Sequence, residues 1–162
     1  MIDEIDRQIL SILQENARTS NAEIARQIDM APSAVLERIR RLEAKGVIQG
    51  YEARINPEAL GLGLLAFVFV RSKDMSDETK TAAALAAFPE VQEVHDIAGE
   101  DCFVLKVRAR DAKSLGLFLR ERVGAIRTVH STRTTVVLET MRETGRLPLA
   151  VPEEKAEEEV LS

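Results

Sequence analysis

The chain has 162 residues, 45% of them hydrophobic, and a formal net charge of −5, which is the composition of a globular protein with one sizeable core or two small ones. Its single cysteine excludes an internal disulfide framework. There is no run of 18 apolar residues and no charged-then-apolar leader, so we expect a cytoplasmic protein with no membrane partner.

The acidic charge gathers at the C-terminus, which weakens it as an argument against a nucleic-acid partner. Residues 152–162 carry five acidic residues and one lysine, as a solvated tail or a frayed helix does. Residues 31–46 instead carry four basic and two acidic residues, a local excess of positive charge. Because groove binding depends on local charge, double-stranded DNA stays a candidate partner.

Three helices are expected in the first fifty residues. Apolar residues at helical spacing predict a helix over residues 3–15. Ser-Asn-Ala-Glu at 20–23 has the form of a capping box and begins a second helix that runs to about residue 28. Pro32 suits the first position of a third helix. The short connection between the second and third helices predicts a helix-turn-helix.

The third helix has two faces of different character. Val35, Ile39 and Leu42 form an apolar stripe that must face a core. The opposite face has small residues near the helix start and guanidinium groups further along, as a helix that enters a DNA major groove requires. A solvated face with ordinary ion pairs is the alternative. The candidate DNA-binding residues are Ser33, Ala34, Glu37, Arg38, Arg40 and Arg41, with Arg54 from the following segment.

Two short strands are expected after this helix, which ends at Lys45-Gly46. Val47-Ile48 and residues 51–55 have strand character and are separated by a Gln-Gly turn. A helix-turn-helix with such a hairpin is a winged helix. Arg54 on the wing could contact the DNA backbone or point into solvent without a contact. Residues 1–56 make up this predicted DNA-binding domain.

A proline and two glycines mark residues 57–63 as a linker between domains. Beyond it we expect strands at 64–71, 91–97, 102–109 and 129–139, with helices at 77–87 and 112–123. This βαββαβ order is that of the ferredoxin-like fold, an antiparallel sheet with both helices on one face. The predicted fold class is therefore α+β. The second domain spans residues 64–143, and residues 144–162 form a C-terminal extension.

The first strand of the second domain is apolar on both of its faces. Leu65, Phe67 and Phe69 alternate along it with Ala66, Val68 and Val70. One set packs under the helices, and the other, left bare, would form a large apolar patch. We therefore expect a second copy of the chain to cover that patch in an obligate homodimer.

The segment Val-Leu-Glu-Arg-Ile-Arg-Arg-Leu-Glu at 35–43, followed by Lys-Gly-Val-Ile-Gln-Gly-Tyr at 45–51, resembles the Lrp/AsnC family of bacterial and archaeal transcription regulators. Further resemblance lies at residues 5–10, 56–57, 95–106 and 132–134, so it covers the chain to about Glu143. Two positions of the helix-turn-helix depart from the family pattern. Asp29 stands where such turns usually have glycine, and aspartate tolerates a left-handed backbone. Ala31 replaces the serine that normally caps the recognition helix, a loss of about 1 kcal/mol.

The resemblance implies that the second domain binds a small effector, usually an amino acid, and assembles dimers into octamers or related rings. The hairpin turn near Gly99 would hold that effector. Glycine lets the backbone approach closely, turn N–H groups could bind a carboxylate, and Glu100 or Asp101 could pair with an ammonium group. The candidate effector-binding residues are Gly99, Glu100, Asp101 and Cys102, with Thr132 and Thr134 added by the resemblance.

The turn departs from the family pattern, which commonly reads Gly-Asp-aromatic-Asp. Glu100 keeps the charge of the first aspartate, Asp101 stands for the aromatic residue, and Cys102 replaces the second aspartate. We therefore expect the effector to have a small or apolar side chain rather than a basic one. A polar turn that binds nothing is the alternative.

No metal site, cofactor or catalytic residue is expected. His95 and Cys102 flank the turn, but with His130 as the remaining candidate they are too few for a zinc site. No phosphate loop or nucleophile–base motif occurs. We favour a ligand-responsive DNA-binding transcriptional regulator. A metabolite-sensing interaction module without DNA binding is one alternative. Another is an enzyme like the sirohaem decarboxylases, which resemble this layout but generally carry a different insertion at 16–20.

Overall fold

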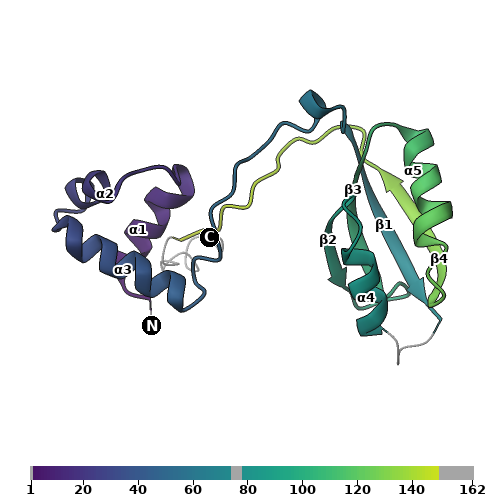
Figure 1. The fold of residues 1–162 in the computed structure, drawn as a ribbon, viewed down its shortest axis with the longest axis horizontal. Coiled ribbons are helices and arrows are strands. Elements are labelled where there is room, and N and C mark those ends of the chain that lie inside the picture. Colours follow the sequence, from purple (N-terminus) through teal and green to yellow (C-terminus); the bar gives the residue numbers. More distant parts are fainter. Residues whose placement is uncertain (1, 74–77, 150–162) are drawn as a thin grey trace, which may run out of the picture. The chain divides into compact units, whose positions relative to one another are not determined.

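The computed structural model describes residues 2–73 and 78–149, which form two compact units (Figure 1). The first unit consists of the residues up to Ala53 together with the described residues from Glu143 onward, and the second unit is Arg54–Arg142. The first residue of the helix predicted at 77–87 lies outside the described residues, as does the acidic tail.

The first unit contains three helices, α1 Glu4–Glu15, α2 Asn21–Gln27 and α3 Pro32–Ala44, which confirm the predicted helix-turn-helix. Its core is made by five buried residues, Ile9, Ile24, Ala25, Val35 and Ile39. The turn between α2 and α3 places Asp29 at φ 53°, the left-handed conformation expected of it. The two helices can therefore cross closely over a tight turn.

The helix caps differ in part from the sequence pattern. Ser20 accepts a hydrogen bond from the Glu23 amide at 3.2 Å, but the Glu23 carboxylate bonds Arg26 and Gln27 instead of completing the predicted capping box. A complete box forms at the start of α1, between Asp3 and Asp6. An arginine one turn further along α2 thus outcompetes the backbone for Glu23.

The two wing strands predicted at Val47-Ile48 and 51–55 are not formed, since no strand lies between α3 and Leu64. Gly46, at φ 68°, ends α3 as predicted, and the amides of Val47 and Ile48 donate to the Leu42 carbonyl at 2.9 and 3.2 Å. A strand needs free main-chain groups to pair with its neighbour. Because the helix end takes those amides, the hairpin has no ladder.

After the second unit the chain returns to the first. We call residues 144–149 the C-terminal strap, because this segment lies against α1. The Leu147 amide donates to Gln14 Oε1 at 2.7 Å, and Gln14 Nε2 donates to the Leu147 carbonyl at 3.0 Å. Arg146 also donates to the Glu15 carbonyl at 3.4 Å. The strap is therefore held by main-chain groups of Leu147 and by the side chain of Arg146.

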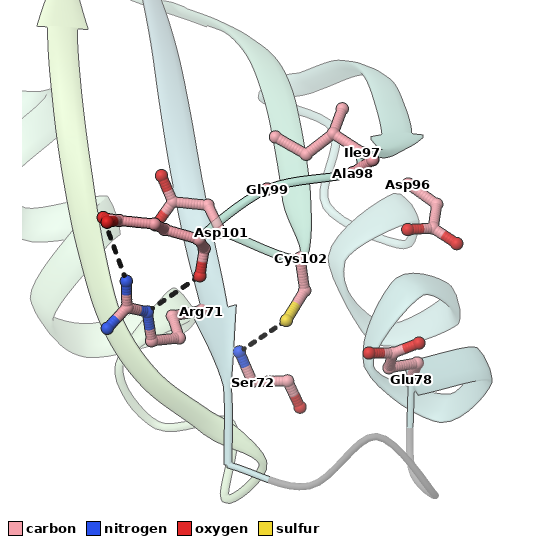
Figure 2. A pocket seen from close by; sticks show the side chains of 10 residues that line it. Arg71, Ser72, Glu78, Asp96, Ile97, Ala98, Gly99, Asp101 and Cys102 are labelled. Atoms are coloured by element: carbon pink, nitrogen blue, oxygen red, sulfur yellow. Dashed lines mark hydrogen bonds and ion pairs between the residues drawn. The ribbon is translucent and has the colours of Figure 1, made fainter.

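The second unit has the predicted βαββαβ order. Its elements are β1 Leu64–Ser72, α4 Glu78–Ala86, β2 Val91–Asp96, β3 Phe103–Ala109, α5 Ala112–Phe118 with a π-helical turn Leu119–Val123, and β4 Val129–Val136. The four strands form an antiparallel sheet in the order β2-β3-β1-β4. The hairpin between β2 and β3 turns beside the end of β1 (Figure 2).

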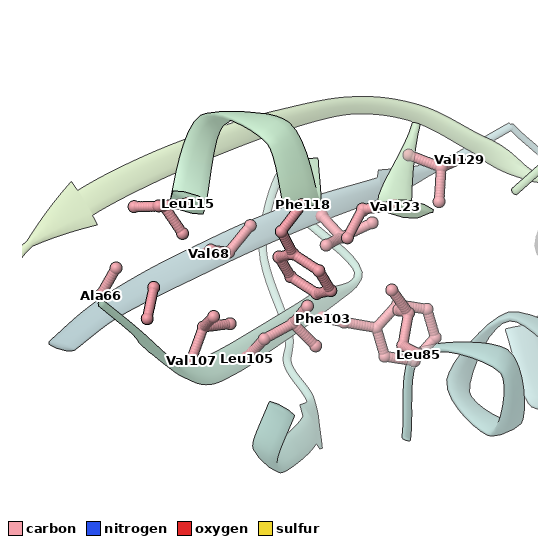
Figure 3. Close-up of a cluster of buried hydrophobic side chains, with 12 residues drawn as sticks. Ala66, Val68, Leu85, Phe103, Leu105, Val107, Leu115, Phe118, Val123 and Val129 are labelled. Atoms are coloured by element: carbon pink, nitrogen blue, oxygen red, sulfur yellow. The ribbon is translucent and has the colours of Figure 1, made fainter. Parts of the chain in front are cut away.

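One face of this sheet carries the core and the other is open. Ala66, Val68 and Val70 pack with Leu85 of α4 and Phe118 of α5, so both helices cover the same face (Figure 3). This confirms the ferredoxin-like fold. The alternate residues of β1 point to the opposite face, as the two-residue period of a strand requires.

Candidate DNA-binding and effector-binding sites

The outward face of α3 is exposed as predicted for a recognition helix. Ser33, Glu37 and Arg40 are exposed and Ala34 is half-buried, while the apolar stripe on the other side is buried. Pro32 is the first helical residue, and the N-cap Ala31 makes no side-chain capping bond. The helix start therefore has no bulky side chain, which lets it approach a groove closely.

Two of the predicted DNA-binding arginines are engaged within the protein. Arg38 Nη1 bonds Asp6 Oδ1 at 2.8 Å and Asp3 Oδ2 at 2.7 Å, and Arg41 Nη2 bonds both Asp6 oxygens at 3.0 Å. Hydrogen bonds from Arg38 and from the Asp6 amide lower the pKa of Asp3. Hydrogen bonds to the carboxylates of Asp3, the larger cause, and of Asp6 raise the pKa of Arg38. This part of α3 is therefore ion-paired to α1.

The other two predicted DNA-binding arginines, Arg40 and Arg54, are exposed and take no part in these ion pairs with α1. Arg40 has no hydrogen-bond or ion-pair partner among the described residues, and it is exposed. Arg54 is also exposed, but it begins the second unit and does not lie on a formed wing. Tyr51 donates its hydroxyl to Glu43 of α3 at 2.9 Å; burial, with that carboxylate, raises the pKa of Tyr51 to about 12. Arg40 is thus the α3 arginine most open to DNA.

A cavity of about 860 Å³ lies at the β2–β3 hairpin (Figure 2). It is lined by residues 96–102 together with Arg71, Ser72 and Glu78. Gly99, at φ 144°, has a backbone conformation that other residues rarely adopt, and a Cβ added there would meet nothing within 4 Å. The turn therefore leaves its backbone open to a ligand.

Hydrogen bonds from the end of β1 hold the hairpin turn in place. The Ser72 amide donates to Cys102 Sγ at 3.3 Å, and Arg71 Nε donates to the Glu100 carbonyl at 3.0 Å. The Arg71 guanidinium also lies 3.5 Å from the Glu100 carboxylate. Cys102, which replaces an acid of the family pattern, thus accepts a backbone hydrogen bond instead of carrying a charge.

The next acid of the turn is paired on the open face of the sheet. Arg133 of β4 bonds Asp101 Oδ2 at 2.9 Å, and its guanidinium lies 4.1 Å from the centre of the Phe69 ring. The distance is that of a cation–π contact. Asp101 therefore connects the cavity to the apolar face on β1.

Four predicted effector-binding residues, those from Gly99 to Cys102, line the cavity, and two do not. Thr132 and Thr134 pair with Val70 and Val68 on the other side of β1. Six residues that line the cavity were not among the predicted effector-binding residues: Arg71, Ser72, Glu78, Asp96, Ile97 and Ala98. Arg71 and Ser72 could have been predicted from the sequence. In an antiparallel pair the end of β1 lies beside the start of β3, and therefore beside the turn.

Among the described residues, no group of three or more His, Cys, Asp or Glu side chains is arranged to hold a metal ion. None of the described helices is long and apolar enough to cross a membrane.

Two families match this chain, one for each part of the fold. Residues 2–49 match the family described as winged helix-turn-helix DNA-binding, and residues 65–147 match the Lrp/AsnC ligand binding domain. The hairpin cavity lies within the second match.

Individual relatives cover nearly the whole chain. HTH-type transcriptional regulator FL11 of Pyrococcus horikoshii is 39% identical over 148 residues, which are 91% of this chain and 97% of that protein. The leucine-responsive regulatory protein of Escherichia coli K12 is 37% identical over 150 residues, 90% of each chain. A feast or famine regulatory protein from M. tuberculosis, solved with L-methionine, has a TM-score of 0.85 and 37% identity, covering 93% of this chain and 100% of that one.

These relatives are regulators, not enzymes, which excludes the decarboxylase alternative. Their similarity runs through both the helix-turn-helix and the ligand-binding sheet domain. The chain belongs to the Lrp/AsnC family of DNA-binding transcriptional regulators.

Proposed function

We propose that this regulator acts as a homodimer that binds double-stranded DNA through α3 and responds to an amino acid held at the hairpin cavity. The observation that carries the proposal is the exposed polar face of α3, with Ser33, Glu37 and Arg40 opposite a buried stripe. Such a regulator works at the chromosome, so its proposed location is the cytoplasm.

DNA binding is tested by selecting sites from random duplex DNA with the purified protein. A dimer presents two α3 helices, so the selected site should be an imperfect palindrome with half-sites one helical turn, or a multiple of it, apart. Arg40→Gln should weaken binding, and the steepness of log affinity against log salt should fall by about 1 for each α3, about 2 for the dimer, if Arg40 binds a phosphate. An asymmetric minimal site, or an unchanged Arg40→Gln affinity, would contradict this assignment of the α3 face.

The homodimer is proposed from the open face of the sheet. Phe67 is 36% exposed there, and Phe69 lies beside it under the Arg133 guanidinium. A second copy would cover this apolar strip. Phe67→Asp should give monomers or aggregates in light scattering, while Lys113→Asp on the exposed side of α5 should leave the assembly unchanged. A monomeric wild-type protein at micromolar concentration would refute the proposal.

Assembly of such dimers into octamers is proposed from the family resemblance. The same light-scattering measurement tests it, because dimers and octamers differ fourfold in mass. A mass that stays at the dimer value, with and without effector, would count against the larger assembly.

The effector is proposed to be an amino acid because the turn offers groups for both of its charged ends. Main-chain N–H groups near Gly99 can receive a carboxylate, and the acidic side chains of Glu78 and Asp96 lie in the same cavity for an ammonium group (Figure 2). The relative from M. tuberculosis was solved with L-methionine, which supports this class of ligand. The uncharged Cys102 still predicts a small or apolar side chain over a basic one.

A calorimetric screen of the twenty amino acids tests this proposal. Gly99→Val should weaken the binding of a detected ligand about tenfold or more, because valine is strained at φ 144° in the turn that lines the cavity. Asp101→Ala should weaken it as well. Gly50→Val, at an ordinary φ outside the cavity lining, is the control. Equal affinity in all variants would place the ligand elsewhere.

A further inference from the structure

A buried carboxylate joins α1 to the middle of the recognition helix. Asp6 is 1% exposed, and its two oxygens accept hydrogen bonds from Arg38, Arg41 and the Asp3 amide. A carboxylate is buried in this way when cations satisfy it. Asp6 therefore belongs to a closed network of two acids and two arginines.

This network constrains the rotation of α3 about its own axis. The apolar stripe of Val35, Ile39 and Leu42 holds α3 against the core, but apolar packing is not directional. Arg38 and Arg41 stand one turn apart and converge on the same carboxylate, which is directional. The angle at which α3 presents its outer face is therefore set by these two ion pairs as well as by packing.

The network also removes charge from the face that meets DNA. Two arginines are balanced by two aspartates, so the four side chains have no net charge. Arg40 is left as the α3 arginine without a partner among the described residues. Non-specific DNA affinity grows with the number of phosphates that cations neutralise, so pairing Arg38 and Arg41 inside the protein limits it.

We propose that Asp6 is a positioning residue for DNA recognition: it directs the outer face of α3 into the groove and keeps Arg38 and Arg41 away from the phosphates. The inference rests on the proposed function, in which α3 binds DNA. Asp6 thereby favours the specific site over random DNA, since it withholds the contacts that every sequence offers.

The test compares Asp6→Asn with wild type on the selected site and on a random duplex of equal length. Asparagine keeps the shape but not the charge, so the two arginines are released toward phosphates. The salt slope on random DNA should steepen by roughly 1 to 2 for each bound α3, and the ratio of specific to random affinity should fall about tenfold. A purely structural role would weaken binding to both duplexes with no change in slope, and that result would overturn the inference.

Two further variants keep the test decisive. Glu4→Gln removes an equal charge from the exposed side of α1 and should leave the slope unchanged; a slope as steep as that of Asp6→Asn would reduce the effect to net charge. If Asp6→Asn fails to fold, as helical circular dichroism would show, Arg38→Gln serves instead. Arg38→Gln should have the same salt slope on random DNA as the wild type. A slope that is less steep by about 1 for each α3 would overturn the inference.

The two levels of proposal fail in different ways. If Arg40→Gln leaves DNA binding unchanged, the α3 interface itself is wrong and this inference falls with it. If Arg40→Gln lowers the salt slope but Asp6→Asn does not raise it, the interface stands and the positioning role is refuted.

Discussion

The substitution Gln14→Ala should loosen the C-terminal strap on α1, where the side chains of Arg7 and Arg146 supply the other hydrogen bonds. Gln14 binds both main-chain groups of one residue, accepting from the Leu147 amide at 2.7 Å and donating to the Leu147 carbonyl at 3.0 Å. Each such bond stabilises by about 0.5 to 1.5 kcal/mol net, and both are exposed, so we take about 0.5 to 0.75 kcal/mol for each. The free energy that holds the strap on α1 should therefore fall by about 1 to 1.5 kcal/mol in Gln14→Ala.

Hydrogen exchange of the Leu147 amide measures this loss of stabilisation directly. A change of 1.4 kcal/mol is tenfold in an equilibrium constant, so the Leu147 amide should exchange about five to ten times faster in Gln14→Ala. Amides of the buried helix core, such as that of Ile9, should be unaffected. Gln8→Ala, an exposed glutamine of the same helix, is the control. An unchanged exchange rate at Leu147 would show that the main-chain bonds do not hold the strap.

Three stability predictions follow from the helix starts of the first unit. Ala31→Ser should raise the free energy of unfolding by about 1 kcal/mol in urea denaturation, because α3 has no side-chain cap, and Ser20→Ala should lower it by about as much. Arg38 lowers the pKa of Asp3 from 3.8 in the folded state, so the stabilisation from Asp3 is complete above that value and is lost as the pH falls below it. Asp3→Asn should therefore make helical circular dichroism less sensitive to acid below pH 3.8 than in wild type; equal acid transitions would contradict this.

Periodicity predicted the helices and strands because each element buries one face. The stripe of Val35, Ile39 and Leu42 and the alternation along β1 are local patterns, visible within a dozen residues. The wing was mispredicted for a local reason that strand propensity does not contain. The end of α3 takes the amides of Val47 and Ile48, so strand-forming residues stay unpaired.

The ion pairs of Arg38 and Arg41 could not be predicted from a helical wheel of α3, because their partner Asp6 lies on α1. A wheel places Arg41 on the outer face, yet its long side chain reaches back to Asp6. The available signal was on α1: helical spacing sets Asp6 among its inward apolar residues, beside Ile9. A carboxylate on a buried face requires a cation, which α3 supplies.

The strap had no sequence signal, because residues 144–149 lack periodicity and are bound mostly through main-chain groups. Thr132 and Thr134 came from the resemblance, and the register of β4 places them opposite Val70 and Val68, away from the cavity lining. In both cases the position depends on long-range pairing. The cavity lining therefore includes the predicted residues Gly99 to Cys102, which are consecutive in the turn. It does not include the predicted residues whose distance from the cavity depends on how the strands of the sheet pair.

The strap also bears on how an effector can influence DNA binding. The first unit is joined to the second by two covalent crossings, one between Ala53 and Arg54 and one between Arg142 and Glu143. An effector can shift DNA affinity only if it binds two states of the protein unequally, typically by 1 to 3 kcal/mol. Loss of the two Gln14–Leu147 hydrogen bonds, at about 1 to 1.5 kcal/mol, lies within that range, so a state in which this part of the strap is detached is energetically accessible to such a ligand. If the two are coupled, Gln14→Ala should change the effector's influence on DNA affinity while leaving binding of DNA without effector as in wild type.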